Sequence, residues 1–173
     1  MTIPTIDQHI RKGALELEKT SDTPVLDSDI LAACILNISR FDLLLKKNGK
    51  APEDFEEKFS KLINKRKKGV PIAYLTNKKD FFEDSFFVDE RVLIPRPESE
   101  FIVTEAVSRL SKKEGEADVL DICCGSGCIG LSILRVSSCN LTLSDISKHA
   151  LEVAEINRKN LFPFNDNIQI IKS

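Results

Sequence analysis

Two acidic residues and a glycine-rich turn in the second half of the sequence have the spacing of a site for a nucleotide-like ligand. The candidate residues, from the end of a predicted strand to the start of a predicted helix, are Asp121, Cys123, Cys124, Gly125, Ser126 and Gly127. Glycine lets the backbone of this glycine turn (residues 123–127) approach a ligand closely, and the following helix presents unpaired N–H groups. Asp145 follows Gly125 by about 20 residues, where an acidic side chain can accept hydrogen bonds from both hydroxyls of a ribose.

Two ligand classes fit a strand, a glycine turn and a helix, and charge discriminates between them. Residues 125–130 match the pattern Gly-x-Gly-x-x-Gly, so an NAD-dependent dehydrogenase is one reading, although a single match is weak evidence. The charge of Asp121 has the wrong sign for the pyrophosphate of NAD. S-adenosylmethionine brings an α-ammonium and a sulfonium instead, and opposite charges ~4 Å apart attract by ~4 kcal/mol at an effective dielectric of about 20. The carboxylate favours the methyl donor, and a helix-capping role remains the alternative for Asp121 and Asp145.

The elements expected around the glycine turn alternate between strand and helix. Strands are predicted at residues 118–123, 141–145 and 168–171, with helices at 128–135 and 147–160 between them. Such alternation predicts a parallel, doubly wound sheet.

The first part of the chain reads as a helical bundle that ends near residue 70. Helix starts are signalled at Thr5 with Gln8 three residues later, at Thr23-Pro24, at Ser39 with Asp42, and at Pro52. Gly69 stands where a helix prefers to end.

Aromatic residues then predict a β-hairpin that links the two parts. Phe81-Phe82 and Phe86-Phe87 would form its strands, with Glu83-Asp84-Ser85 as the turn. A further helix is expected to begin at Pro97. The predicted organisation is therefore a helical domain at 1–70, a hairpin linker at 71–96 and an α/β domain at 97–173.

Composition narrows the class of protein. The formal net charge is −2, with 42% hydrophobic and 30% charged residues, as in a globular protein without a field that attracts nucleic acid. The opening residues lack the apolar core of a secretory signal, and no membrane-spanning run occurs, so a cytoplasmic protein is expected. The five cysteines have neither the spacing of a disulfide framework nor that of a zinc site, and no metal is expected.

Two long stretches resemble the PrmC/HemK family of glutamine N5-methyltransferases. The first runs from Gly69 to Glu100 and contains G-V-P-I-A-Y-L, the aromatic hairpin and I-P-R-P-E-S-E. The second runs from Val119 to Asn157 and contains D-I-C-C-G-S-G-C-I-G and D-I-S-K-H-A-L. The resemblance is specific from Gly69 onward, whereas in the helical part only the architecture is similar.

The resemblance implies a fold, a cofactor and a substrate. The fold would be an α/β protein with an N-terminal helical bundle for substrate recognition, a β-hairpin linker, and the first half of a Rossmann-like methyltransferase domain with an incomplete parallel sheet. The cofactor would be S-adenosyl-L-methionine, held by the glycine turn, Asp121 and Asp145. The partner would be a class I peptide chain release factor, whose Gly-Gly-Gln glutamine is methylated. Arg96 and Glu100 would shape the substrate pocket; the alternative is that Pro95-Arg96-Pro97 only fixes a turn and that Glu100 only stabilises the first turn of the following helix. Cys123 stands where the family often has glycine.

One part of the family pattern is missing from these residues. The family positions the glutamine amide with an Asn-Pro-Pro-Tyr motif, and that sequence does not occur here. We therefore expect an interrupted or shortened chain, with no catalytic residue assigned and no methyl transfer by itself. A methyltransferase for RNA or a small molecule, and a non-catalytic module that binds release factors, are the alternatives.

Overall fold

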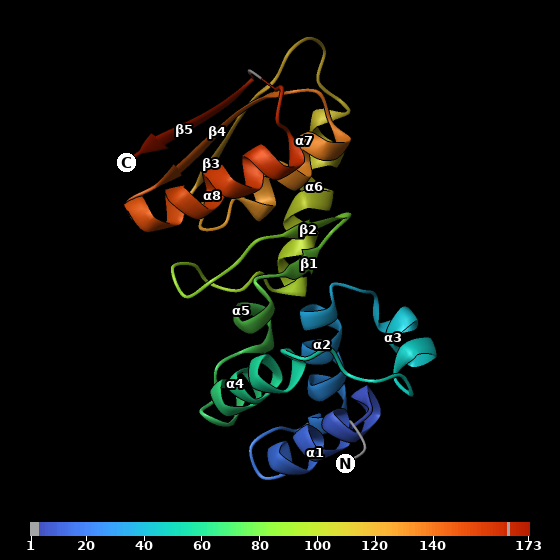
Figure 1. Ribbon diagram of the computed structural model, residues 1–173. Coiled ribbons are helices and arrows are strands. Elements are labelled where there is room, and N and C mark those ends of the chain that lie inside the picture. The colour runs from blue at the N-terminus through green and yellow to red at the C-terminus, as the bar shows by residue number, and fades with distance from the viewer. Residues whose placement is uncertain (1–3, 166) are drawn as a thin grey trace. The chain divides into compact units, whose positions relative to one another are not determined.

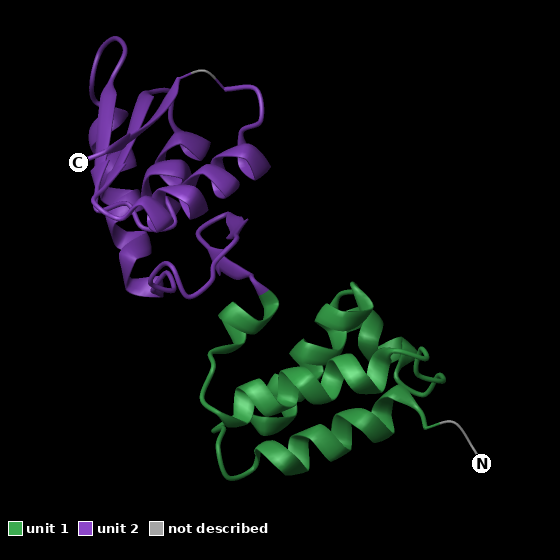
Figure 2. Ribbon diagram, turned by 60° about the vertical axis from the view of Figure 1, so that its left-hand side comes forward, with its two compact units in different colours: residues 1–76 green, residues 77–173 purple. Residues whose placement is uncertain are grey.

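The structure is a computed structural model that describes residues 4–165 and 167–173, and the chain forms two compact units (Figure 2). The helical unit comprises residues 1–76 and the sheet unit residues 77–173. No helix within the described residues is long and apolar enough to cross a membrane.

The helical unit follows the predicted helix signals closely. Its helices are α1 (Ile6–Leu17), α2 (Pro24–Leu36), α3 (Arg40–Lys46), α4 (Phe55–Lys67) and α5 (Ile72–Thr76). The capping box of Thr5 and Gln8 is present, and the Ser39 hydroxyl accepts the Asp42 N–H. The predicted start at Pro52 is wrong by three residues, because Glu53 and Asp54 form a turn that the Phe55 N–H closes on the Pro52 carbonyl. The short helix α5 was not predicted, since five residues are too few to show a helical period.

A stacked aromatic pair lies in the core of the helical unit. Phe55 and Phe59 stack with ring centroids 5.4 Å apart, and Leu17, Leu31 and Ile63 are buried in the same cluster. Apolar residues at helical spacing on α1, α2 and α4 thus form one core.

The β-hairpin is confirmed, but its turn differs from the prediction. Strands β1 (Lys79–Phe81) and β2 (Asp84–Phe86) pair antiparallel, so Asp84 lies in a strand and not in the turn. The turn is made by Phe82 and Glu83, and Phe82 has a left-handed φ of 55°. Side chains alternate between the two faces of β2, and this alternation buries Phe86. The ring of Phe86 contacts that of Phe81 edge to face, with the ring centroids 6.2 Å apart.

The predicted alternation of strands and helices is confirmed in the sheet unit. After the 3-10 turn η1 (Pro97–Ser99), the elements are α6 (Glu100–Leu110), β3 (Asp118–Ile122), α7 (Cys128–Val136), β4 (Asn140–Asp145), α8 (Lys148–Leu161) and β5 (Ile168–Lys172). The strands form a parallel sheet in the order β3-β4-β5.

Two successive crossovers in one direction place α7 and α8 on the same face of the sheet (Figure 1). Leu141 and Leu143 of β4 are buried on the sheet, whereas Leu120 and Ile122 of β3 are 57% and 63% exposed. Within the described residues the sheet is therefore covered on one face, and the second helical layer of a doubly wound sheet is not among the described elements. The carboxyl ends of β3 and β4 meet at the edge where the glycine turn begins.

Candidate functional site

The glycine turn connects the end of β3 to the start of α7, and three of its residues have a left-handed backbone conformation. Cys123, Gly125 and Gly127 have φ values of 61°, 55° and 77°. The turn is closed by the Gly127 N–H, which donates to the Cys124 carbonyl at 2.8 Å, and tied to β4 by the Cys124 N–H, which donates to the Ser144 carbonyl at 3.0 Å. For the two glycines this conformation is unstrained, whereas for Cys123 it costs about 1–2 kcal/mol.

The three glycines of the Gly-x-Gly-x-x-Gly pattern meet different surroundings. A Cβ at Gly125 would meet no heavy atom within 4 Å. A Cβ at Gly127 would lie 3.2 Å from a methyl of Leu143, and at Gly130 only 2.6 Å from the other methyl. Gly130 is therefore required for close packing of α7 on the sheet, whereas Gly125 borders open space that a ligand can approach.

Asp121 lies on β3 with its carboxylate beside the first turn of α7. Its Oδ2 accepts the Gly130 N–H at 2.9 Å. Burial raises the pKa of Asp121, the hydrogen bond from Gly130 opposes the rise, and the negative charge of Asp145 adds to it. The capping alternative is thus present for Asp121, and the same carboxylate also places negative charge next to the glycine turn.

Asp145 is the last residue of β4, and each of its two carboxylate oxygens accepts a hydrogen bond from a backbone N–H group. Its Oδ2 accepts the Gly125 N–H at 3.0 Å, and its Oδ1 accepts the Ser147 N–H at 2.9 Å. The residue is 9% exposed. The helix cap of α8 is Ser147, whose hydroxyl accepts the Ala150 N–H, so the capping alternative does not hold for Asp145. Each carboxylate oxygen of Asp145 keeps a second lone pair and can still accept a hydrogen bond from a ligand. The role of Asp145 at a ribose stays a prediction.

The cysteines around the turn are free thiols in unlike surroundings. Burial raises the pKa of Cys124 to about 12 and that of Cys128 to about 11, and the charge of Asp121 adds to both. Both stay protonated at neutral pH, whereas Cys123 is exposed. Among the described residues no group of acidic, histidine and cysteine side chains is arranged to hold a metal ion.

The two residues predicted for a substrate pocket are not joined to the glycine turn by a hydrogen bond among the described residues. Arg96 is exposed in the extended segment before η1. Glu100 lies at the start of α6, and its Oε1 accepts the Phe82 N–H at 3.0 Å, which holds the hairpin turn. The structure therefore assigns Glu100 a contact with the hairpin, and the pocket role of both residues stays a prediction.

Asn157 of α8 was not singled out from the sequence as a site residue, yet it contacts the glycine turn directly. Its Nδ2 donates to the Ser126 carbonyl at 2.9 Å and to the Phe87 carbonyl at 3.0 Å, and its Oδ1 accepts the Phe87 N–H at 2.7 Å. It is 1% exposed. The signal for it was a polar residue in the apolar stripe of α8, in line with Ala150 and Val153.

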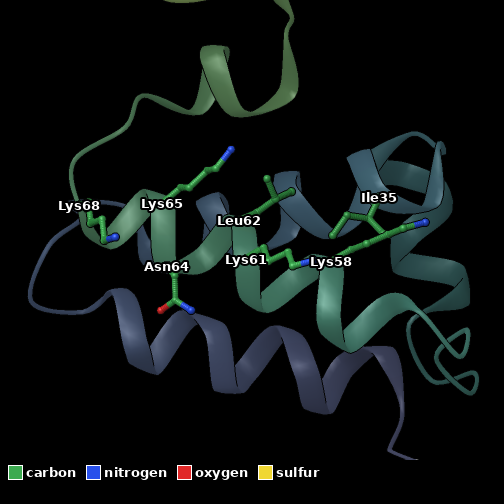
Figure 3. A pocket seen from close by; sticks show the side chains of 7 residues that line it. All are labelled: Ile35, Lys58, Lys61, Leu62, Asn64, Lys65 and Lys68. Atoms are coloured by element: carbon green, nitrogen blue, oxygen red, sulfur yellow. The ribbon is translucent and has the colours of Figure 1, made fainter.

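A groove of about 550 Å³ lies in the helical unit and shares no residue with the glycine turn (Figure 3). It is lined by Ile35, Lys58, Lys61, Leu62, Asn64, Lys65 and Lys68. Lys58 and Lys61 pair with Asp54 and Glu57 one helical turn earlier, so part of its positive charge is matched within α4.

Comparisons with known proteins agree with both units. Residues 8–76 match the PrmC N-terminal domain, and residues 102–170 match the methyltransferase small domain. The release factor glutamine methyltransferase of Leptospira interrogans is 43% identical over 94% of this chain and 58% of its own length. The protein of the same name from Clostridium acetobutylicum is 38% identical over 84% of this chain and 51% of its own length.

The chain thus spans about half the length of these curated relatives. A solved structure of coclaurine N-methyltransferase bound to N-methylheliamine and SAH is 18% identical, covers 96% of this chain and 49% of its own, and has a TM-score of 0.36. Two domain models thus match in the expected order, and relatives named release factor glutamine methyltransferase align over most of this chain, in agreement with the resemblance of residues 69–100 and 119–157 to the PrmC/HemK family.

Proposed function

We propose that the chain binds S-adenosyl-L-methionine as part of an enzyme that methylates the glutamine side chain of the Gly-Gly-Gln motif in class I peptide chain release factors. Relatives named release factor glutamine methyltransferase support this activity. The helical unit would recognise the release factor, the hairpin at the start of the sheet unit would link it to the parallel sheet, and such a substrate would place the protein in the cytoplasm.

One observation carries the proposal, namely the half-buried carboxylate of Asp121 on β3, which lies beside the first turn of α7 and the open glycine turn. In dinucleotide enzymes the first N–H groups of this helix receive pyrophosphate. Here Asp121 accepts one of them, the Gly130 N–H, and puts a negative charge where a pyrophosphate would lie. This arrangement supports a positively charged ligand and disfavours NAD.

The residues present fit the methyl donor. The backbone at Gly125 is open to close approach, Asp121 can neutralise an α-ammonium, and Asp145 retains lone pairs for ribose hydroxyls. When bound, the donor supplies an electrophilic methyl group on its sulfonium. The chain's own residues would fix its orientation, and orientation is the part of the rate acceleration that a positioned site provides.

The acceptor glutamine requires more than these residues. A carboxamide nitrogen is a poor nucleophile because its lone pair is delocalised into the carbonyl, and the family uses Asn-Pro-Pro-Tyr to position it. Because the printed sequence contains no such motif, we expect these 173 residues to bind the donor without transferring its methyl group.

Binding and methylation are tested separately. Calorimetric titration of the chain with S-adenosylmethionine, S-adenosylhomocysteine and NAD should show binding of the first two alone, and binding of NAD instead would overturn the donor assignment. Incubation of the chain with methyl-labelled donor and a class I release factor should leave the Gly-Gly-Gln peptide unlabelled, and label on that glutamine would refute the expected inactivity. Label on RNA or a small molecule, or binding of the release factor without donor binding, would favour the two alternative functions.

A further inference from the structure

The buried carboxamide of Asn157 joins two segments that are far apart in the sequence. With the backbone of Phe87 it forms a closed pair of hydrogen bonds, one accepted and one donated, at 2.7 and 3.0 Å. Its second N–H donates to the Ser126 carbonyl at 2.9 Å. Phe87 directly follows strand β2, and Ser126 lies within the glycine turn, between Gly125 and Gly127.

An asparagine at this position has no equivalent substitute. The carboxamide supplies one acceptor and two donors, and all three are used. Asn157 and Ser126 are 1% and 3% exposed, so water does not replace a lost partner, and a broken bond would leave a buried polar group unsatisfied.

The hairpin is also held by contacts that do not involve the glycine turn. Asp84 of β2 forms two hydrogen bonds with Arg135 of α7, at 2.8 and 2.9 Å. Glu100 of α6 accepts the Phe82 N–H in the hairpin turn. Asn157 is hydrogen-bonded both to Phe87, which follows the hairpin, and to the glycine turn.

We infer that Asn157 is a positioning residue, which holds the Ser126 carbonyl and with it the donor-binding conformation of residues 125–127, and which transmits donor binding to the aromatic hairpin at Phe87. The inference rests on the proposed function, since the ligand that reports on it is the methyl donor. It goes further, because it assigns the hairpin a state that depends on ligand binding.

The test uses an isosteric variant and a matched control. Asn157→Asp keeps the size of the side chain and the acceptor for Phe87 N–H, but it replaces both donor hydrogens with a second acceptor oxygen. Asp84→Asn weakens the anchor of the hairpin to Arg135 and leaves Ser126 untouched. S-adenosylhomocysteine affinity should fall on the order of tenfold in the first variant, the effect of about one net hydrogen bond, and stay within about twofold of the parent in the second. Equal affinities in both folded variants would overturn the inference.

Amide hydrogen exchange supplies a readout that general loss of stability does not mimic. In the parent chain and in Asp84→Asn, S-adenosylhomocysteine should slow exchange of the Phe87 amide, and in Asn157→Asp it should not. Should the variant fail to fold, the parent chain still decides, because donor binding without any change at Phe87 contradicts the inference.

Failure of the proposed function gives a different result. A parent chain that does not bind S-adenosylhomocysteine overturns the donor assignment. The ligand-free exchange rates then test the inference by themselves. Asn157→Asp should increase the exchange rate of the Gly127 amide, whereas Asp84→Asn should change the exchange rates of hairpin amides only. An unchanged exchange rate of the Gly127 amide in Asn157→Asp would contradict the positioning role.

Discussion

Replacing Asp121 with asparagine should stabilise the chain and weaken its binding of the methyl donor. Asparagine has the same shape and keeps an acceptor for the Gly130 N–H, so the substitution removes the charge and little else. Because burial raises the pKa of Asp121, the ionised carboxylate is disfavoured in the folded chain, and the negative charge of Asp145 adds to this. The same charge attracts the ammonium of a bound donor.

The pH dependence of stability follows from the direction of this pKa shift. A carboxyl whose folded pKa lies above its unfolded value, about 3.9, destabilises the fold while it is ionised. This penalty is fully present above the folded pKa and disappears as the pH falls through it towards the unfolded value. Asp121→Asn should therefore have a higher midpoint of unfolding than the parent at pH 7, and the difference should shrink as the pH is lowered.

The expected loss of affinity can be bounded. Direct attraction between two charges ~4 Å apart is ~4 kcal/mol at an effective dielectric near 20, but desolvation leaves a net charged hydrogen bond of about 1.5–3 kcal/mol. Affinity for S-adenosylhomocysteine should thus fall roughly 10- to 150-fold, which calorimetric titration at pH 7 measures directly.

A ligand without the ammonium provides the control. 5′-Methylthioadenosine shares the adenosine and the sulfur but lacks the amino acid end, so Asp121→Asn should leave its affinity unchanged. An equal loss for both ligands would mean that the substitution deforms the glycine turn. No loss for S-adenosylhomocysteine would show that Asp121 only caps α7, and the charge argument for the donor would then be refuted.

Three further predictions concern the glycine turn and its packing. Cys123→Gly should raise the free energy of unfolding, measured by urea denaturation, by about 0.5–1 kcal/mol, because glycine adopts a φ of 61° without strain, although it also makes the unfolded chain more flexible. The control variant Cys124→Gly leaves a cavity at a buried position and should lower the free energy of unfolding. Gly130→Ala should lower the free energy of unfolding by about 1–3 kcal/mol, because the new Cβ would lie 2.6 Å from a methyl of the fully buried Leu143. A variant as stable as the parent chain would show that α7 can move away from the sheet to make room for the methyl group. With pKa values of about 12 and about 11, Cys124 and Cys128 should react with iodoacetamide at pH 7.5 far more slowly than Cys123 in the folded chain, and peptide mass spectrometry that finds equal rates would contradict their burial.

Local sequence signals predicted most of the elements because their causes lie within a few residues. The capping box of Thr5 and Gln8 spans a single helical turn, and the strand-turn-helix pattern around Gly125 is contiguous in the chain. The hairpin turn was misplaced because the alternation that buries Phe81 and Phe86 also allows Asp84 in a strand, where Arg135 pairs with it across 51 positions. That partner is not visible in the local pattern.

From the sequence alone came the order of helices and strands, the glycine turn with its two acidic residues, and the resemblance to a methyltransferase family. The tertiary structure decided what those residues contact. In the folded chain both carboxylate oxygens of Asp145 accept backbone N–H groups, and Cys123 adopts a left-handed backbone conformation. Folding also brings Asn157 into contact with Phe87 and Ser126, which lie 70 and 31 positions away in the chain. Side-chain types and local periods are properties of short segments, whereas the hydrogen bonds of buried polar groups exist only once packing has excluded water and brought distant segments together.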